Sequence, residues 1–109
     1  MKVRIYPGGE TADFGAERWT VEWWTLRASA ARKNLERDEI DWDRDLESNL
    51  SGHPTREVAI ARAKERASES FFGCAVVQQQ RVDWFVEEDR VAEWADIGDP
   101  LEVTPDSHD

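Results

Sequence analysis

The segment PTREVAIARAKERASESFFG, residues 54–73, limits the fold more than any other part of the chain. Its apolar residues recur at the three- and four-residue spacing of one helix face, and the charged residues lie largely off that face. The residues of the apolar face are Ala59, Ile60, Ala63, Ala67 and Phe71. Pro54 or Thr55 is suited to begin the helix, and Gly73 to close it in the left-handed conformation. Because alanines allow close approach, we predict a helix packed against a sheet.

Alternating apolar and polar residues predict the strands of that sheet. In residues 18–26, tryptophan and valine alternate with polar residues, as in a half-buried strand. Residues 74–86 and 90–97 form two further β-rich segments on either side of the acidic sequence EEDR. Pairing Val86 with Val91 gathers Val82, Trp84 and Val86 on one face with Val91, Ala95 and Ile97. We therefore favour this register over a slip by one residue.

Shorter segments complete the expected architecture. KVRIY (2–6) is a short strand ended by a turn signal, GDP (98–100) ends the second hairpin, and LEV (101–103) adds one more short strand. Residues 28–52 contain helix formers, but acids follow at the C-terminal end, where the helix dipole disfavours negative charge. We therefore expect a partly helical insertion.

These elements predict a single α+β domain over residues 1–104. An antiparallel sheet of about four strands in two hairpins is packed by one main helix, and residues 105–109 form a mobile tail. With 109 residues the chain is long enough for one core, and 39% hydrophobic content argues against disorder. The single cysteine forms no internal disulfide, and the sequence holds no apolar run of signal or membrane-span length. We expect an intracellular, soluble, cytoplasmic protein.

The charge is strongly acidic and unevenly distributed. The chain holds 24 acids and 14 bases, a net charge of −10, which disfavours direct contact with nucleic acid or anionic membranes. Residues 36–47 hold seven acids and two bases, and residues 83–102 hold eight acids and one base. We expect these two segments to form a shared anionic surface for a basic protein partner. The predicted contact residues are Asp38, Asp41, Trp42, Asp43, Asp45, Glu87, Glu88, Asp89 and Glu93.

Such a surface is able to imitate nucleic acid. Acids two residues apart on a strand lie about 6.5–7 Å apart, a spacing comparable to that of phosphates along a nucleic-acid strand. The partner would then be a nucleic-acid-binding protein. Exposed Trp42 or Trp24 would supply aromatic anchors within the acidic surface.

Catalytic and metal-binding patterns are weak. DWDRD (41–45) has the alternating acids of a calcium loop, but Leu46 stands where the turn needs glycine and Gly52 where the ion needs glutamate. Cys74 is expected to be a small buried residue, His53 to help start the helix, and His108 to lie in the tail. We expect no enzyme activity, no metal and no cofactor.

In small size, single domain, acidity and lack of a catalytic motif, the chain resembles the small inhibitor and accessory proteins of phages, including anti-restriction and anti-CRISPR proteins. Two alternatives stay open. One is a structural protein that self-associates through its tryptophan-rich strands, with Trp24 at the contact and a homodimer as one outcome. The other is a metal-assisted hydrolase that uses Asp41, Asp43 and Asp45.

Overall fold

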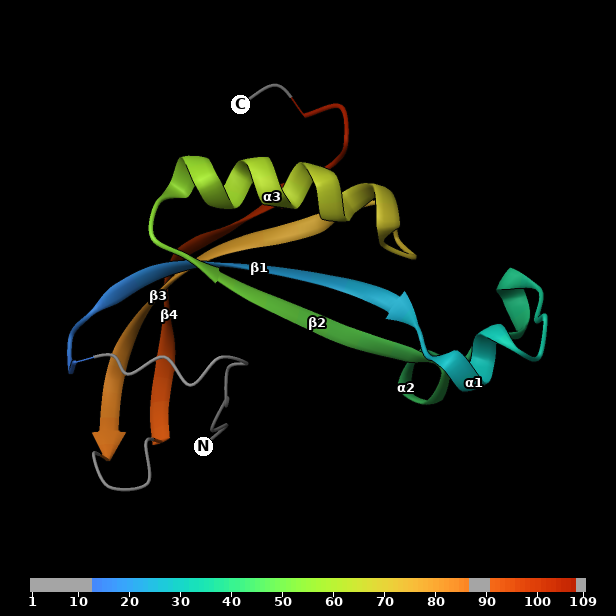
Figure 1. Cartoon of the computed structure of the whole chain (residues 1–109), viewed down its shortest axis with the longest axis horizontal. Helices are drawn as coiled ribbons and strands as arrows, with labels where there is room; N and C mark the ends of the chain where they lie inside the picture. The colour runs from blue at the N-terminus through green and yellow to red at the C-terminus, as the bar shows by residue number, and fades with distance from the viewer. Residues whose placement is uncertain (1–12, 87–90, 108–109) are drawn as a thin grey trace.

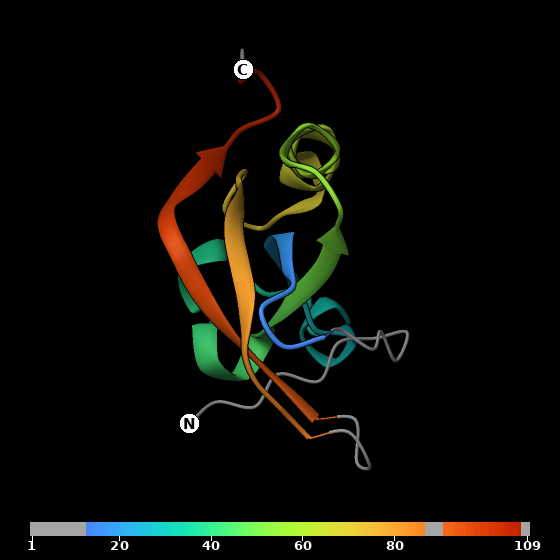
Figure 2. The same cartoon turned by 90° about the vertical axis from the view of Figure 1, so that its left-hand side faces the viewer.

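A computed structural model of the protein describes residues 13–86 and 91–107. It is an α+β fold in which four antiparallel strands form one sheet in the order β2-β1-β3-β4, with one long helix across a single face (Figures 1 and 2). The elements are β1 Glu17–Leu26, α1 Ala28–Ala31, the 3-10 turn η1 Arg37–Glu39, α2 Trp42–Asp45, β2 Leu46–His53, α3 Arg56–Glu69, β3 Ala75–Val86 and β4 Val91–Val103. The predicted fold class is confirmed. The strand predicted at 2–6 lies outside the described residues.

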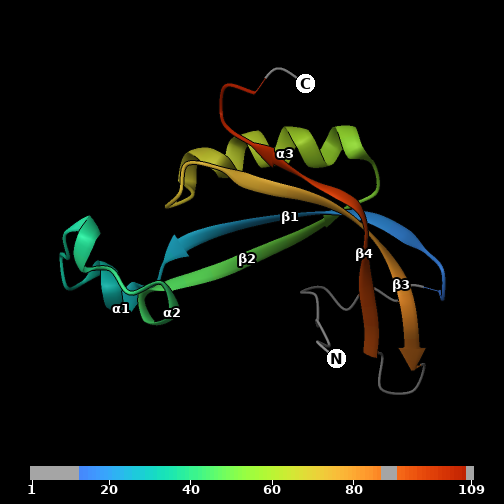
Figure 3. The ribbon, with the colours of Figure 1, turned by 180° about the vertical axis from the view of Figure 1, so that it is seen from behind.

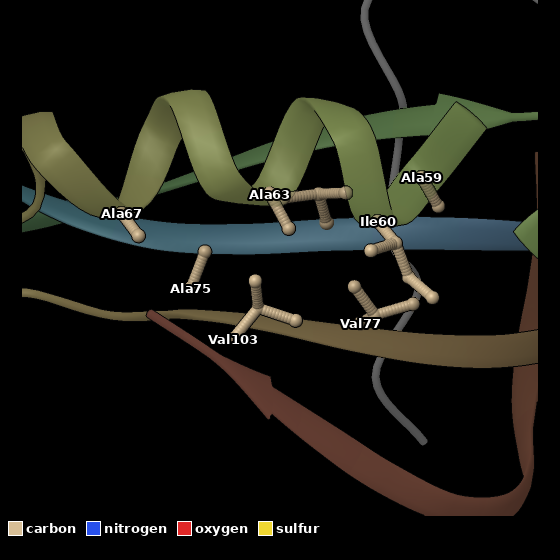
Figure 4. Packing of buried hydrophobic residues seen from close by; sticks show 8 residues of the cluster. Ala59, Ile60, Ala63, Ala67, Ala75, Val77 and Val103 are labelled. Atoms are coloured by element: carbon tan, nitrogen blue, oxygen red, sulfur yellow. The ribbon is translucent and has the colours of Figure 1, made fainter. Parts of the chain in front are cut away.

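The helix α3 is the predicted one, and its apolar face builds the core. Thr55 caps it, because the threonine hydroxyl accepts a hydrogen bond of 3.2 Å from the backbone N–H of Val58. The buried alanines of α3 pack against β1 and β3, and Figure 4 shows Val77 below the helix. Val21 of β1 belongs to the same cluster. The helix ends at Glu69, earlier than predicted, and Gly73 (φ 71°) serves the turn into β3 instead of the cap.

The strand β2 corrects the prediction for residues 28–52. Only the first part of residues 28–52 is an insertion with short helical turns. Leu46–His53 is a strand paired with β1, with Trp24 opposite Ser48 and Thr20 opposite Gly52. The polar sequence of β2 resembles a loop because this strand lies at the edge of the sheet. An edge strand is held mainly by backbone hydrogen bonds to one neighbour and needs few apolar side chains.

The β3–β4 hairpin follows the predicted register only near its turn. Val86 pairs with Val91 as expected, but a bulge at Asp83 shifts the pairing, so that Val82 lies opposite Trp94 and Arg81 opposite Ala95. The prediction that Ala95 and Ile97 lie on the same face as Val82 is therefore wrong.

The sequence GDP also differs from expectation, because it does not end β4. A second irregularity in the pairing lies there, with Gly98 at φ 72°, and the strand continues to Val103. Figure 3 shows β3 and β4 bending away from α3. The turn residues thus curve the sheet instead of terminating it.

The two faces of the sheet differ in character. Trp19, Val21 and Trp23 of β1 belong to the core beneath α3. The alternate residues of β1 lie on the helix-free face, where Arg18 is buried with its guanidinium 3.6 Å from the ring centre of Trp94. Among the described residues, no helix has the length and apolar character to cross a bilayer.

Gly52 makes room for the buried arginine. A Cβ atom at this position would lie 3.2 Å from a terminal nitrogen of Arg18, which the Trp94 ring keeps from moving away freely. We expect Gly52→Val to lower the free energy of unfolding by about 1–3 kcal/mol, as overpacking does, although valine favours strands. Urea denaturation measures this, with Glu47→Val on the same strand as the exposed control. Equal stability of both variants would contradict the expectation.

Candidate functional site

An aromatic cluster covers the end of the sheet that carries the insertion. The ring of Phe72 contacts two indoles edge to face, with centroids 5.7 Å from Trp24 and 5.3 Å from Trp42. Phe71 contacts Phe72 in the same manner at 5.3 Å. The rings come from three elements far apart in sequence: β1, α2 and the turn after α3. The cluster therefore ties the insertion to the helix–sheet core.

The single turn of α2 holds Trp42 outward. Asp41 caps this turn, because its Oδ1 accepts hydrogen bonds from the backbone N–H groups of Asp43 (3.0 Å) and Arg44 (3.3 Å). The following residue, Trp42, leaves 68% of its surface exposed despite its contact with Phe72. Such exposure is unusual, because tryptophan is largely buried in most folded proteins.

Asp45 has a structural role instead of the predicted contact role. Its side chain is only 2% exposed, pairs with Arg44 at 3.1 Å and accepts a 2.9 Å hydrogen bond from the backbone N–H of Asp41. The hydrogen bond from Arg44 and that from Asp41 lower the pKa of the Asp45 carboxyl below its usual value. Asp45 closes the turn from beneath and is not available to a partner.

The turn that presents Phe72 is anchored on both sides. The N–H of Phe71 donates a 2.7 Å hydrogen bond to the carbonyl oxygen of Trp24, which holds the turn against the end of β1. Arg37 of η1 lies over the Phe71 ring at 4.7 Å and donates to the Phe71 carbonyl at 3.4 Å. The insertion thus contacts the turn after α3 through an arginine as well as through Trp42.

A shallow cavity of about 320 Å³ opens between these elements, which we name the Trp42 hollow. It is lined by Trp24, Trp42, Asp43, Leu46, Ser48 and Phe72. Asp43 is an exposed acid in its lining, and exposed Asp38, Glu39 and Asp41 belong to the same insertion. The hollow therefore combines aromatic walls with a surrounding segment of net negative charge.

A second hollow of about 200 Å³ lies on the helix-free face of the sheet. The side chains of Glu22 and Ser48, joined by a 2.7 Å hydrogen bond, stand between the two hollows, since each lines one of them. In the second hollow, the amide of Gln80 donates to Asp96 at 2.6 Å, and that of Gln78 donates to the carbonyl of Ile97 at 2.9 Å. Its polar groups are largely satisfied by each other and by the backbone.

The structure brings part of the predicted contact set together. Asp38 in η1 and Asp41, Trp42 and Asp43 in and around α2 share the end of the molecule that carries the insertion. Glu93 lies on β4 near the hairpin turn, at the opposite end of the long axis (Figure 1). Glu87, Glu88 and Asp89 lie outside the described residues. Of the predicted contact residues that the structure describes, Glu93 thus lies apart from those of the insertion.

Phe72 is the site residue that sequence reasoning missed. The pair Phe71–Phe72 was assigned to the end of the helix, with Phe71 on its apolar face. Adjacent residues point in different directions in any regular element, so two successive phenylalanines before a glycine were a signal that one of them packs elsewhere.

The residues considered for catalysis that the structure describes are Cys74 and His53. Cys74 is partly buried, and burial together with the charge of Glu102 raises the pKa of its thiol, which disfavours the reactive thiolate. His53 ends β2, where its Nε2 lies 2.8 Å from the Ser51 hydroxyl. Within residues 13–86 and 91–107, no group of three or more histidines, cysteines and acids has the arrangement to hold a metal ion.

Comparison of the chain with protein-family models, with curated proteins and with solved structures gave no match.

Proposed function

We propose that the protein is a non-enzymatic binding protein that docks on a basic protein surface through the end that carries the Trp42 hollow. The observation that carries this proposal is the 68% exposure of Trp42 beside a cavity. Trp42 belongs to residues 36–47, which hold seven acids and two bases. Tryptophans are enriched among the residues that dominate protein interfaces.

The charge and the aromatic rings have separate tasks in such docking. Exposed acids attract a basic partner over a Debye length and speed association, but they contribute little lasting affinity because salt and water screen them. Trp42 and Phe72, which is 36% exposed, offer apolar surface whose burial slows dissociation. The acids therefore govern the rate of encounter, and the aromatic rings the lifetime of the complex.

The proposal is tested by moving charge at two places on the same protein. The triple change Asp38→Lys, Glu39→Lys and Asp43→Lys reverses three exposed acids of the insertion. The matched control Asp99→Lys, Glu102→Lys and Asp106→Lys changes the net charge equally, at the end of β4 and the turn after it. Fluorescence anisotropy of a labelled deca-lysine peptide, at about 50 and 300 mM salt, measures binding to each variant.

We expect the insertion variant to bind the peptide about tenfold more weakly than the control variant, because local charge acts more strongly than net charge under screening. The affinity of the unchanged protein is expected to fall steeply between the two salt concentrations. Equal weakening of both variants would show that deca-lysine responds to the total charge alone, and would overturn the proposed docking site.

A further inference from the structure

The chain repeatedly stacks arginine on aromatic rings. Arg18 lies 3.6 Å from the ring centre of Trp94, Arg37 4.7 Å from that of Phe71, and Arg66 4.9 Å from that of Trp23. In the part of the chain that the structure describes, no arginine or lysine stacks on the Trp42 or Phe72 rings. Residues 13–86 and 91–107 thus supply no stacked cation to the Trp42 and Phe72 rings of the hollow.

The polar atoms of the Trp42 hollow also suit a cation. Asp43 offers an exposed carboxylate that only accepts hydrogen bonds. The hydroxyl of Ser48 donates its hydrogen to Glu22 at 2.7 Å, so its oxygen faces an incoming group as an acceptor. Apart from the indole N–H groups, the polar atoms of the hollow therefore accept hydrogen bonds, and a bound group has to donate them. A partner group with several N–H donors and a positive charge satisfies both the carboxylate and the rings.

We propose that the Trp42 hollow receives one arginine side chain of the basic partner. This inference rests on the proposed function and names the group that the site recognises. The guanidinium plane stacks on the exposed indole of Trp42, and its N–H groups donate to Asp43, with the aliphatic stem against Phe72 and Leu46. Arginine fits better than lysine because its charge is planar, weakly hydrated and able to donate two hydrogen bonds side by side.

The size of the hollow agrees with a single side chain. At about 320 Å³ it lies at the lower limit of the range for cavities that enclose whole small molecules. The second hollow is smaller, and both of its carboxylates already accept hydrogen bonds: Asp96 from the amide of Gln80 at 2.6 Å, and Glu22 from the hydroxyl of Ser48 at 2.7 Å. A buried polar network that satisfies itself stabilises the fold and has little left to offer a ligand.

The experiment compares two peptides of equal charge. One is deca-lysine and the other is the same peptide with one central lysine replaced by arginine. We expect the unchanged protein to bind the arginine peptide about fivefold more tightly, the range of a partly desolvated cation–π contact. Anisotropy titrations at about 150 mM salt reduce the contribution of long-range attraction, which the two peptides share.

Variants assign the preference to the hollow. Trp42→Ala is expected to remove the preference for arginine, so that the two peptides bind equally well, because the stacking surface is lost. Asp43→Asn, which keeps the shape of the residue, is expected to reduce the preference in part. Trp84→Ala removes a tryptophan on β3 that is 42% exposed, and serves as the control that keeps the preference. Circular dichroism checks that each variant is folded.

The outcomes separate this inference from the function on which it rests. If the unchanged protein binds both peptides equally well, and the three insertion acids still control the affinity, the arginine assignment is overturned and the docking proposal stands. If Trp42→Ala keeps the preference, the hollow is not the arginine site. If neither peptide binds at low salt, the docking proposal itself fails.

Discussion

Replacing Ile60 by alanine is expected to lower the free energy of unfolding by about 2–5 kcal/mol, the range for removing a large aliphatic side chain from a core. Ile60 is 5% exposed and lies in the cluster between α3 and the sheet (Figure 4). The other residues that α3 contributes to this cluster are alanines, which cannot fill the space that the lost atoms leave. A loss of this size is a large share of the stability of a domain of about 100 residues.

Val58→Ala on the same helix is the matched control. It also replaces a β-branched residue by alanine, so both variants gain helix propensity, but Val58 is 47% exposed. We expect its stability to change by less than about 0.5 kcal/mol, as for most surface substitutions. Thermal and urea unfolding of the two variants measure the difference. A similar loss for both would mean that the packing of α3 on the sheet contributes little to stability.

The helix and its partner strands could be predicted because their side chains carry a periodic signal. Ala59, Ala63 and Ala67 are spaced for one helix face, and Trp19, Val21 and Trp23 for one strand face. β2 carries no such signal. Its pairing with β1 is a backbone interaction across an insertion, and the residues between the two strands hide the hairpin from local reasoning.

The irregular positions of the sheet also lie beyond the reach of pattern reading. The residues GDP have the chemistry of a turn, and Gly98 does adopt the left-handed conformation. Such residues end a strand or bend it according to whether the neighbouring strand continues beside them. Here β3 does continue, and its Ala75 pairs with Val103. The bulge at Asp83 changes the register for the same reason, since the pairing on both sides of it is set by tertiary packing.

The candidate site shows the same limit at the scale of single residues. Asp41, Asp43 and Asp45 alternate in the sequence and were predicted to act alike. In the structure, Asp41 caps the α2 turn, Asp43 lines the hollow and Asp45 is buried beneath the turn. A one-turn helix places such residues on different sides, so identical residue types acquire different roles. The sequence predicts an exposed anchor at Trp42 or Trp24, and the fold exposes Trp42, leaves Trp24 half-buried and adds Phe72, which contacts both rings.

Asp45→Asn is expected to destabilise the protein markedly at neutral pH. The asparagine keeps the size of the side chain and an acceptor for the N–H of Asp41, but it cannot form the ion pair with Arg44. The α2 turn would then lose the ion pair with Arg44 that helps to close it. We expect a lower urea midpoint for this variant, and weaker presentation of Trp42, visible as a loss of affinity for the arginine peptide. Asp43→Asn, whose side chain is exposed, is the control that leaves the midpoint nearly unchanged.

The pH dependence identifies the cause of that loss. Because the hydrogen bond from Arg44 holds the pKa of Asp45 below its usual value, folding favours the ionised carboxylate. Its contribution is complete above the pKa of the unfolded chain, about 3.9, and disappears as the pH falls through the lower pKa of the folded protein. The difference in urea midpoint between the unchanged protein and Asp45→Asn is therefore expected to be constant from about pH 7 to pH 5 and to shrink below about pH 4. A difference that stays constant at all pH values would mean that Asp45 acts through shape and hydrogen bonding alone, without its charge.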